Sequence, residues 1–143
     1  MDMGPADLKL LVFDTKRKGP EHSPVKKPNG EAKKFTGTWS VEAHHIDGSV
    51  IKREFDDLKD LKENPEWTSF CGTITYRNSV TIKKGENHTM DLGKVFGVSE
   101  LLINGVNAGI KWYGRRIYRV TEFIRDGDNE IVIKIVTTMG NYM

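Results

Sequence analysis

Aromatic and basic side chains gather in the stretch GIKWYGRRIY, residues 109–118. Aromatic faces stack on the C–H surfaces of sugars, while arginine and asparagine side chains donate hydrogen bonds to hydroxyl groups. Such mixtures suit polar ligands in shallow pockets, so this stretch is a candidate carbohydrate contact surface. The candidate residues are Asn107, Lys111, Trp112, Tyr113, Arg115, Arg116 and Tyr118.

The same residues also allow a purely structural interpretation. Trp112 would then cap the core, and the arginines would be solvated or paired with acids. We favour this structural interpretation and expect Trp112 to be partly buried at one end of the fold. One edge of its ring should face outward beside Tyr113 and Arg115, since an indole N–H in the interior needs a hydrogen-bond partner.

Carboxylates cluster between residues 54 and 63, but their pattern does not suit catalysis. A glycosidase needs two carboxyl groups that face each other across a cleft, and this segment has the composition of a solvated turn. Solvated acids are the favoured interpretation of this segment. The acidic residues are Glu54, Asp56, Asp57, Asp60 and Glu63.

Other catalytic and cofactor motifs are missing from the sequence. His44 and His45 are adjacent in a predicted strand, so they point to opposite faces and cannot chelate one metal together. The chain contains no HExxH or CxxC motif, no Walker loop and no GxSxG motif. Cys71 is the only cysteine and is predicted to be a structural thiol. We therefore predict no catalytic residue, no metal ligand and no cofactor.

Composition limits the classes of partner. The 143 residues carry a formal net charge of +2, are 37% hydrophobic and are 29% charged. Without a strong overall charge, nucleic acid is not an expected partner, and the chain has no apolar run long enough to cross a membrane. The length suits one domain with a sizeable core.

The first 34 residues differ from the rest. Residues 8–13 are predicted to form a short strand, and residues 16–34 contain seven lysines and arginines but only two glutamates. Several prolines and glycines make this a basic, flexible connector. A polyanion-binding arm is the alternative, but no aromatic residues interleave with the charges. We thus divide the chain into this N-terminal segment, 1–34, and a β-sandwich, 35–143.

Alternating patterns after residue 35 predict about eight or nine short strands and almost no helix. The predicted strands cover 38–46, 49–55, 69–82, 88–95, 97–104, 107–112, 117–121 and 129–138. Trp39, Val41 and Ala43 should share one face, and the spacing of Phe55, Leu58 and Leu61 predicts a helical turn or two before Pro65. This spacing predicts an all-β fold, an antiparallel jelly-roll sandwich.

Two dipeptides predict tight hairpins. Asp47-Gly48 and Asn104-Gly105 both accept the positive φ angles of a type I′ turn. After the second turn, Gly109 should permit close backbone approach or a bulge that redirects the following side chains.

The order of motifs from residue 70 onward resembles a known domain type. The stretches FCGTITYRNSVTI, MDLGKVFGVSELLINGVNAGIKW and IYRVTEFIRDGDNEIVIKIVTT are similar to galactose-binding-like jelly rolls attached to glycoside hydrolases. They resemble the sugar-binding domain of family 2 enzymes, and still more the C-terminal domain of family 106 α-L-rhamnosidase-like proteins. The positions that carry the resemblance are Phe70, Gly72, Tyr76, Asp91, Leu92, Gly93, Asn104, Gly105, Gly109, Trp112, Tyr118, Val120, Gly127, Asn129, Ile131 and Ile133.

The resemblance implies a non-catalytic accessory module, truncated or excised from a larger glycoside hydrolase. Its expected partners are the catalytic domain of that enzyme and, at the aromatic stretch, an oligosaccharide or polysaccharide. The parent enzyme is expected in the periplasm or outside a bacterial cell. Some domains of the galactose-binding-like type hold a structural calcium ion, and the acidic residues 56–63 could do so here, although solvated acids are the favoured interpretation. A free-standing carbohydrate-binding module and a purely structural or interaction domain are the alternatives. An exposed apolar patch would favour a docking role over sugar binding.

Overall fold

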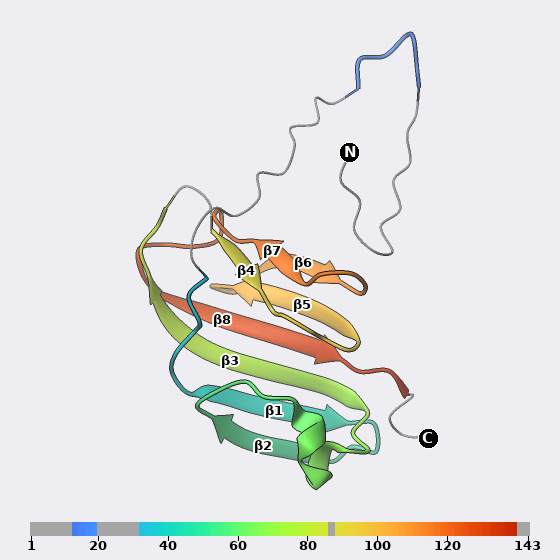
Figure 1. Cartoon of the computed structure of the whole chain (residues 1–143), viewed down its shortest axis with the longest axis vertical. Coiled ribbons are helices and arrows are strands. Elements are labelled where there is room, and N and C mark those ends of the chain that lie inside the picture. Colours follow the sequence, from blue (N-terminus) through green and yellow to red (C-terminus); the bar gives the residue numbers. More distant parts are fainter. Residues whose placement is uncertain (1–12, 20–31, 86–87, 140–143) are drawn as a thin grey trace.

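The computed structural model describes residues 13–19, 32–85 and 88–139. It is an all-β, antiparallel sandwich, as predicted, with a sheet of six strands and a small second sheet of two strands (Figure 1). The strand orders are β2-β1-β3-β8-β5-β6 and β4-β7. Residues 13–19 and 32–38 form no helix or strand. Most of the predicted strand 8–13 and residues 20–31 of the basic connector lie outside the described residues.

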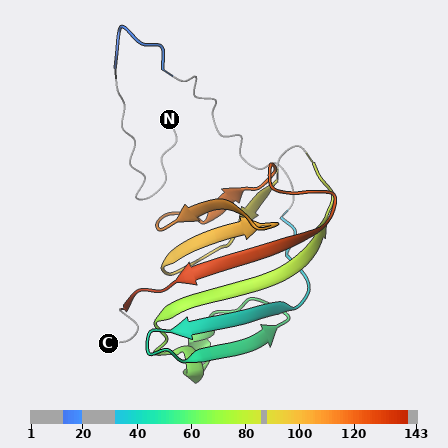
Figure 2. The same ribbon diagram turned by 180° about the vertical axis from the view of Figure 1, so that it is seen from behind.

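Most strands agree with the predicted ones, but the strand predicted over 88–95 covers only Thr89–Asp91, and the one predicted over 117–121 ends at Arg119. Figure 2 shows the large sheet from behind. The larger sheet contains β1 Trp39–His45, β2 Val50–Phe55, β3 Gly72–Ile82, β5 Val98–Ile103, β6 Val106–Lys111 and β8 Gly127–Val136. The smaller sheet contains β4 Thr89–Asp91 and β7 Ile117–Arg119. Two short 3₁₀ helices, η1 Leu61–Glu63 and η2 Pro65–Trp67, lie between β2 and β3.

One face of the six-stranded sheet carries the core. Trp39, Val41 and Ala43 are buried on it, as the alternation predicted, and they belong to one cluster with side chains from β3, β5 and β8. Met90 of β4 and Trp67 of η2 join the same cluster from outside the sheet. The small sheet and the segment around η2 therefore supply the second layer of the sandwich.

The helical turn predicted before Pro65 forms, but only at the end of the segment that begins at Phe55. The first helical residue is Leu61, and Leu58 is exposed instead of facing the core. The second helix begins after Asn64, whose side chain accepts a hydrogen bond from the backbone N–H of Glu66 at 3.1 Å. This cap and the following proline favour a start at residue 65.

Both predicted hairpins form, although one turn type was wrong. Asn104 and Gly105 have φ angles of 53° and 79°, as a two-residue turn of the predicted kind requires. At the other hairpin only Gly48 has a positive φ, 89°, and His45 pairs with Ser49 across a three-residue loop. The Asp47 carboxylate accepts the backbone N–H of Ser49 at 2.8 Å, a local bond that favours ordinary φ at the aspartate.

Candidate functional site

A bulge in the β5–β6 hairpin decides which way the aromatic stretch points. Leu101 pairs with Gly109 and Leu102 pairs with Asn107, so Ala108 is an extra residue in β6. Gly109 has a φ of 137°, and a Cβ there would lie 3.6 Å from the Tyr118 ring. This confirms the prediction that Gly109 permits a bulge. The extra residue reverses the alternation and turns the side chains of the next residues toward the other face.

Trp112 is consequently exposed. Its side chain is 71% accessible, so the prediction of a partly buried indole was wrong. The preceding outward residue, Ile110, is 60% accessible, whereas Lys111 points inward and places its ammonium 5.6 Å from the centre of the Tyr118 ring. Tyr113 packs edge-on against Trp112, with ring centres 4.6 Å apart. The indole thus faces solvent without a core contact.

Tyr118 and Arg116 have structural positions instead of the predicted surface ones. The Tyr118 ring is buried, and its hydroxyl donates to the backbone oxygen of Ser99 at 2.8 Å. Burial raises the pKa of the Tyr118 hydroxyl. The Arg116 guanidinium is also buried and donates to the backbone oxygens of Gly114 (3.0 Å) and Gly97 (2.7 Å). These side chains hold the loop 112–116 and cannot reach a surface ligand.

The side chains of the other predicted contact residues differ in whether they could reach a surface ligand. The Asn107 amide supports the bulge, because it donates to Glu100 at 2.6 Å and accepts the N–H of Gly109 at 2.7 Å. The exposed Arg115 lies 3.6 Å from Asp91 in an ion pair. A hollow of about 210 Å³ is lined by residues 110–115. Trp112, Tyr113 and Arg115 are therefore the members of the predicted set that remain exposed at this end.

Further exposed apolar residues lie near Trp112 on the outer face, by which we mean the face of the six-stranded sheet opposite the core. Val98 pairs with Val136, and both side chains are exposed. Ser99 pairs with Lys111, which brings the next residue, Trp112, beside Val98 at the end of the ladder. We call the exposed set Val98, Ile110, Trp112 and Val136 the apolar end.

The charges in the next row of the outer face are paired with one another. Lys134 lies 3.4 Å from Glu100, and Glu42 lies 3.3 Å from Lys52. His44 also contacts Glu42 at 2.7 Å, and hydrogen bonds from His44 and Lys52 hold the pKa of the Glu42 carboxyl below its usual value. Beside the apolar end, the surface therefore offers few free charges.

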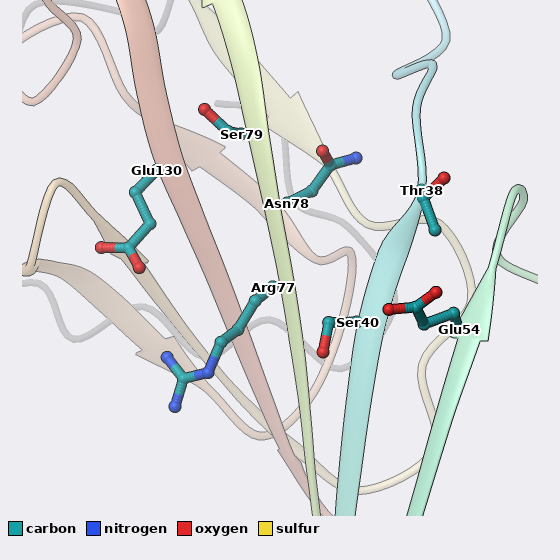
Figure 3. A pocket seen from close by; sticks show the side chains of 7 residues that line it. All are labelled: Thr38, Ser40, Glu54, Arg77, Asn78, Ser79 and Glu130. Carbon is teal, nitrogen blue, oxygen red and sulfur yellow. The ribbon is translucent and has the colours of Figure 1, made fainter.

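A second, larger hollow, which we call the polar hollow, lies toward the other end of the outer face (Figure 3). Its volume is about 310 Å³, and strands β1, β2, β3 and β8 all contribute to its lining. The sequence analysis did not single out this site, because its residues are separated by up to 92 positions and meet only through strand pairing. The lining residues are Thr38, Ser40, Glu54, Arg77, Asn78, Ser79 and Glu130.

The acidic segment does not form a metal site in the structure. In the described ranges, no three histidine, cysteine, aspartate or glutamate side chains gather as a metal ion would require. Asp57 instead pairs with Lys34 at 2.6 Å, and Asp56 accepts a hydrogen bond from Thr38 at 3.1 Å. Residues 13–19, 32–85 and 88–139 also contain no helix that is long and apolar enough to cross a membrane.

Comparison with known proteins links the chain to glycoside hydrolases. No protein-family model matches it. A curated protein, the "putative beta-glucuronidase" of Formosa agariphila, is 29% identical over 114 residues, which cover 75% of this chain. The structure of a rhamnosidase from Novosphingobium sp. PP1Y superimposes with a TM-score of 0.69 at 27% identity over 83% of the chain. The chain is related to a glycoside hydrolase-associated domain.

This domain makes up a small part of the matching proteins. The chain spans 10% of the length of the curated relative and 12% of the rhamnosidase chain. A β-D-mannosidase from Dictyoglomus thermophilum shares the fold, with a TM-score of 0.55 at 17% identity over 73% of this chain and 15% of its own. The similarity therefore covers the β-sandwich and leaves most of each relative unmatched.

Proposed function

We propose that this chain is a non-catalytic accessory β-sandwich of a larger glycoside hydrolase, of the α-L-rhamnosidase-like or family 2-like kind. It packs against a neighbouring domain of that enzyme through the apolar end of its outer face. The observation that carries the proposal is the exposed apolar set of Val98, Ile110, Trp112 and Val136, which spans two neighbouring rows. Contiguous apolar surface of this kind marks interaction sites in soluble proteins.

Two features support a protein partner at the apolar end. The nearest charges, Lys134 and Glu100, already neutralise each other, so a largely uncharged protein surface can cover them at little cost. An exposed tryptophan surrounded by aliphatic side chains is also typical of the centre of a protein interface. The much greater length of the relatives supports the presence of a neighbouring domain in the parent enzyme.

The carboxylates support a non-catalytic role. Glycoside hydrolysis requires two opposed carboxyl groups, one of them with a raised pKa. Among the described residues, no aspartate or glutamate is buried. The catalytic residues therefore belong to another domain of the parent, which we place in the periplasm or outside a bacterial cell.

The proposal is tested by co-expressing this chain with the remainder of its parent enzyme as separate polypeptides. Their association is then measured by isothermal titration calorimetry. The paired change Ile110→Ser and Trp112→Ser should weaken association by at least tenfold, because central apolar anchors supply most of the binding energy. Leu58→Ser is the matched control, since Leu58 is exposed outside the apolar end. Equal affinity in wild type and the paired variant would refute the docking role.

Direct contact with carbohydrate is the second candidate for the same surface. It is favoured by the exposed Trp112 ring beside Tyr113 and Arg115, over the hollow of about 210 Å³. In that case Trp112→Ala should abolish binding of an oligosaccharide and leave the melting temperature nearly unchanged. We rank this candidate lower because aliphatic side chains surround the indole, and sugar sites pair aromatic faces with polar donors.

A further inference from the structure

The apolar end continues into the hollow of about 210 Å³ that residues 110–115 line, which we call the loop hollow. Ile110 and Trp112 belong to both surfaces. A domain that docks on the apolar end therefore also covers the loop hollow. The chemistry of the loop hollow then indicates which group of that domain fits there.

Two cations line the loop hollow, and little neutralises them. The Lys111 ammonium forms no ion pair with any residue that the structure describes, and it lies 5.6 Å from the centre of the Tyr118 ring. Arg115 pairs only with Asp91, at 3.6 Å, and its side chain is 80% exposed. Exposed ion pairs contribute little free energy and are easily exchanged. The loop hollow therefore offers positive charge to a ligand.

A third positive charge lies behind the same loop. The Arg116 guanidinium is buried, and the acceptors of its hydrogen bonds are the backbone oxygens of Gly114 and Gly97. Neither acceptor is an anion, and the Arg116 Nε–H has no partner among the described residues. A buried charge without a counter-ion costs free energy. An anion on the outer side of the loop would lower that cost through the field of Arg116, without touching its side chain.

The backbone of the loop supplies further donors. Gly114 has a φ of 68°, and the N–H groups of Tyr113, Gly114 and Arg115 form no hydrogen bond within the described ranges. The Gly114 oxygen accepts from the Arg116 guanidinium, and in a trans peptide the next N–H points the opposite way. The Arg115 N–H therefore points away from the buried guanidinium. Consecutive free N–H groups in such a turn form concavities that bind anions.

We propose that the loop hollow binds a carboxylate group, and that an aspartate or glutamate side chain of the neighbouring domain supplies it. The inference rests on the docking role proposed above and specifies the partner surface: apolar side chains against the apolar end, with an acidic side chain beside them. Carboxylate oxygens accept from ammonium, guanidinium and backbone N–H groups alike, and these charge-assisted bonds are stronger than neutral ones. A docked domain also excludes water from the loop hollow, which strengthens the attraction.

The first test examines the anion site in the full chain alone. The probe is sodium acetate, and sodium chloride at equal ionic strength is the reference. ¹H–¹⁵N NMR follows the backbone N–H signals of Tyr113, Gly114 and Arg115. We expect saturable shifts with acetate, and loss of these shifts when Lys111→Gln and Arg115→Gln are combined. No shift beyond that in chloride, or an unchanged shift in the double variant, would overturn the anion site.

The second test examines the source of the carboxylate, by calorimetric titration with the remainder of the parent enzyme. Lys111→Gln together with Arg115→Gln should weaken association about tenfold, since two charged donors are lost. The matched control is Lys59→Gln with Lys83→Gln, which removes the same charge at exposed positions outside the loop hollow and should bind like wild type.

The outcomes of the second test separate this inference from the docking role. Association that the Lys111 and Arg115 changes leave intact would refute the carboxylate contact and leave the docking role standing. Equal weakening in the control variant would refute it too, because overall charge would then explain the effect. Absence of association in wild type would refute the docking role and, with it, a neighbouring domain as the source of the carboxylate.

Discussion

The three tryptophans have contrasting environments, and this contrast predicts their contributions to stability. Trp39 and Trp67 are buried in the core, whereas Trp112 is exposed on the outer face. We expect Trp112→Ala to change the free energy of unfolding by less than about 0.5 kcal/mol, as is usual for surface substitutions. Trp39→Ala should cost about 3–5 kcal/mol, as large aromatic deletions in cores do. Urea denaturation of both variants measures the difference, and a large loss at Trp112 would mean that its ring packs in solution.

Tyr76 predicts a stability change at high pH. Burial, with a smaller contribution from the charge of Asp60, raises the pKa of its hydroxyl to about 12. The folded protein therefore retains a proton that the unfolded chain, with a tyrosine pKa of about 10, has already lost. Stability from this group is complete below pH 10 and falls between pH 10 and 12, by at most about 1.4 kcal/mol per pH unit.

Tyr76→Phe is the variant that isolates this effect. Stability curves of wild type and variant should run in parallel up to pH 10, and the wild type should then decline more steeply. The two curves are measured by urea denaturation at each pH. An identical decline in both proteins would show that Tyr76 ionises as freely in the folded protein as in the unfolded chain.

At the scale of elements, two glycines with positive φ angles should respond differently to the same substitution. Gly97 precedes β5 with a φ of 111°, and a Cβ there would come within 2.2 Å of the backbone oxygen of Val136. Gly114 has a φ of 68°, but its Cβ would meet no atom within 4 Å. Gly114→Ala should cost about 1 kcal/mol from backbone conformation alone.

Gly97→Ala should cost clearly more than Gly114→Ala, because β5 must move away from β8 as well. The Gly97 oxygen also accepts a hydrogen bond from Arg116, so a shift there disturbs the loop 112–116. Thermal unfolding of the two variants gives the comparison. Equal melting temperatures would mean that the start of β5 can move without loss of stability.

The strands and turns were predictable because they depend on local alternation and on residues such as Asn104-Gly105. The orientation of the Trp112 side chain was not predictable, although Gly109 indicated a bulge. A bulge changes the face of every later residue, and its position follows from pairing between β5 and β6. The burial of Arg116 depends on the Gly97 oxygen, 19 positions away, and therefore on tertiary packing. The polar hollow has no local signal, because four strands contribute to it.

At the scale of the whole molecule, the outer face divides into two chemically different ends. The apolar end lies over β5, β6 and β8, and the polar hollow lies over β2, β1, β3 and β8. The paired charges of Glu42, Lys52, Glu100 and Lys134 occupy the row between Ser40 and Val136. The two ends of one face therefore differ in the chemistry that they present to solvent.

The apolar end predicts how the isolated chain behaves in solution. Without a partner, Ile110 and Trp112 remain in water, so the chain should self-associate weakly as its concentration rises. Sedimentation velocity measures this association. Ile110→Ser together with Trp112→Ser should reduce it, whereas Leu58→Ser should not. Because apolar contacts are not screened by salt, the association should persist in about 0.5 M NaCl. Loss of association in salt, with no effect of the paired serine variant, would show that charged groups hold the molecules together and would remove the main support for docking through this surface.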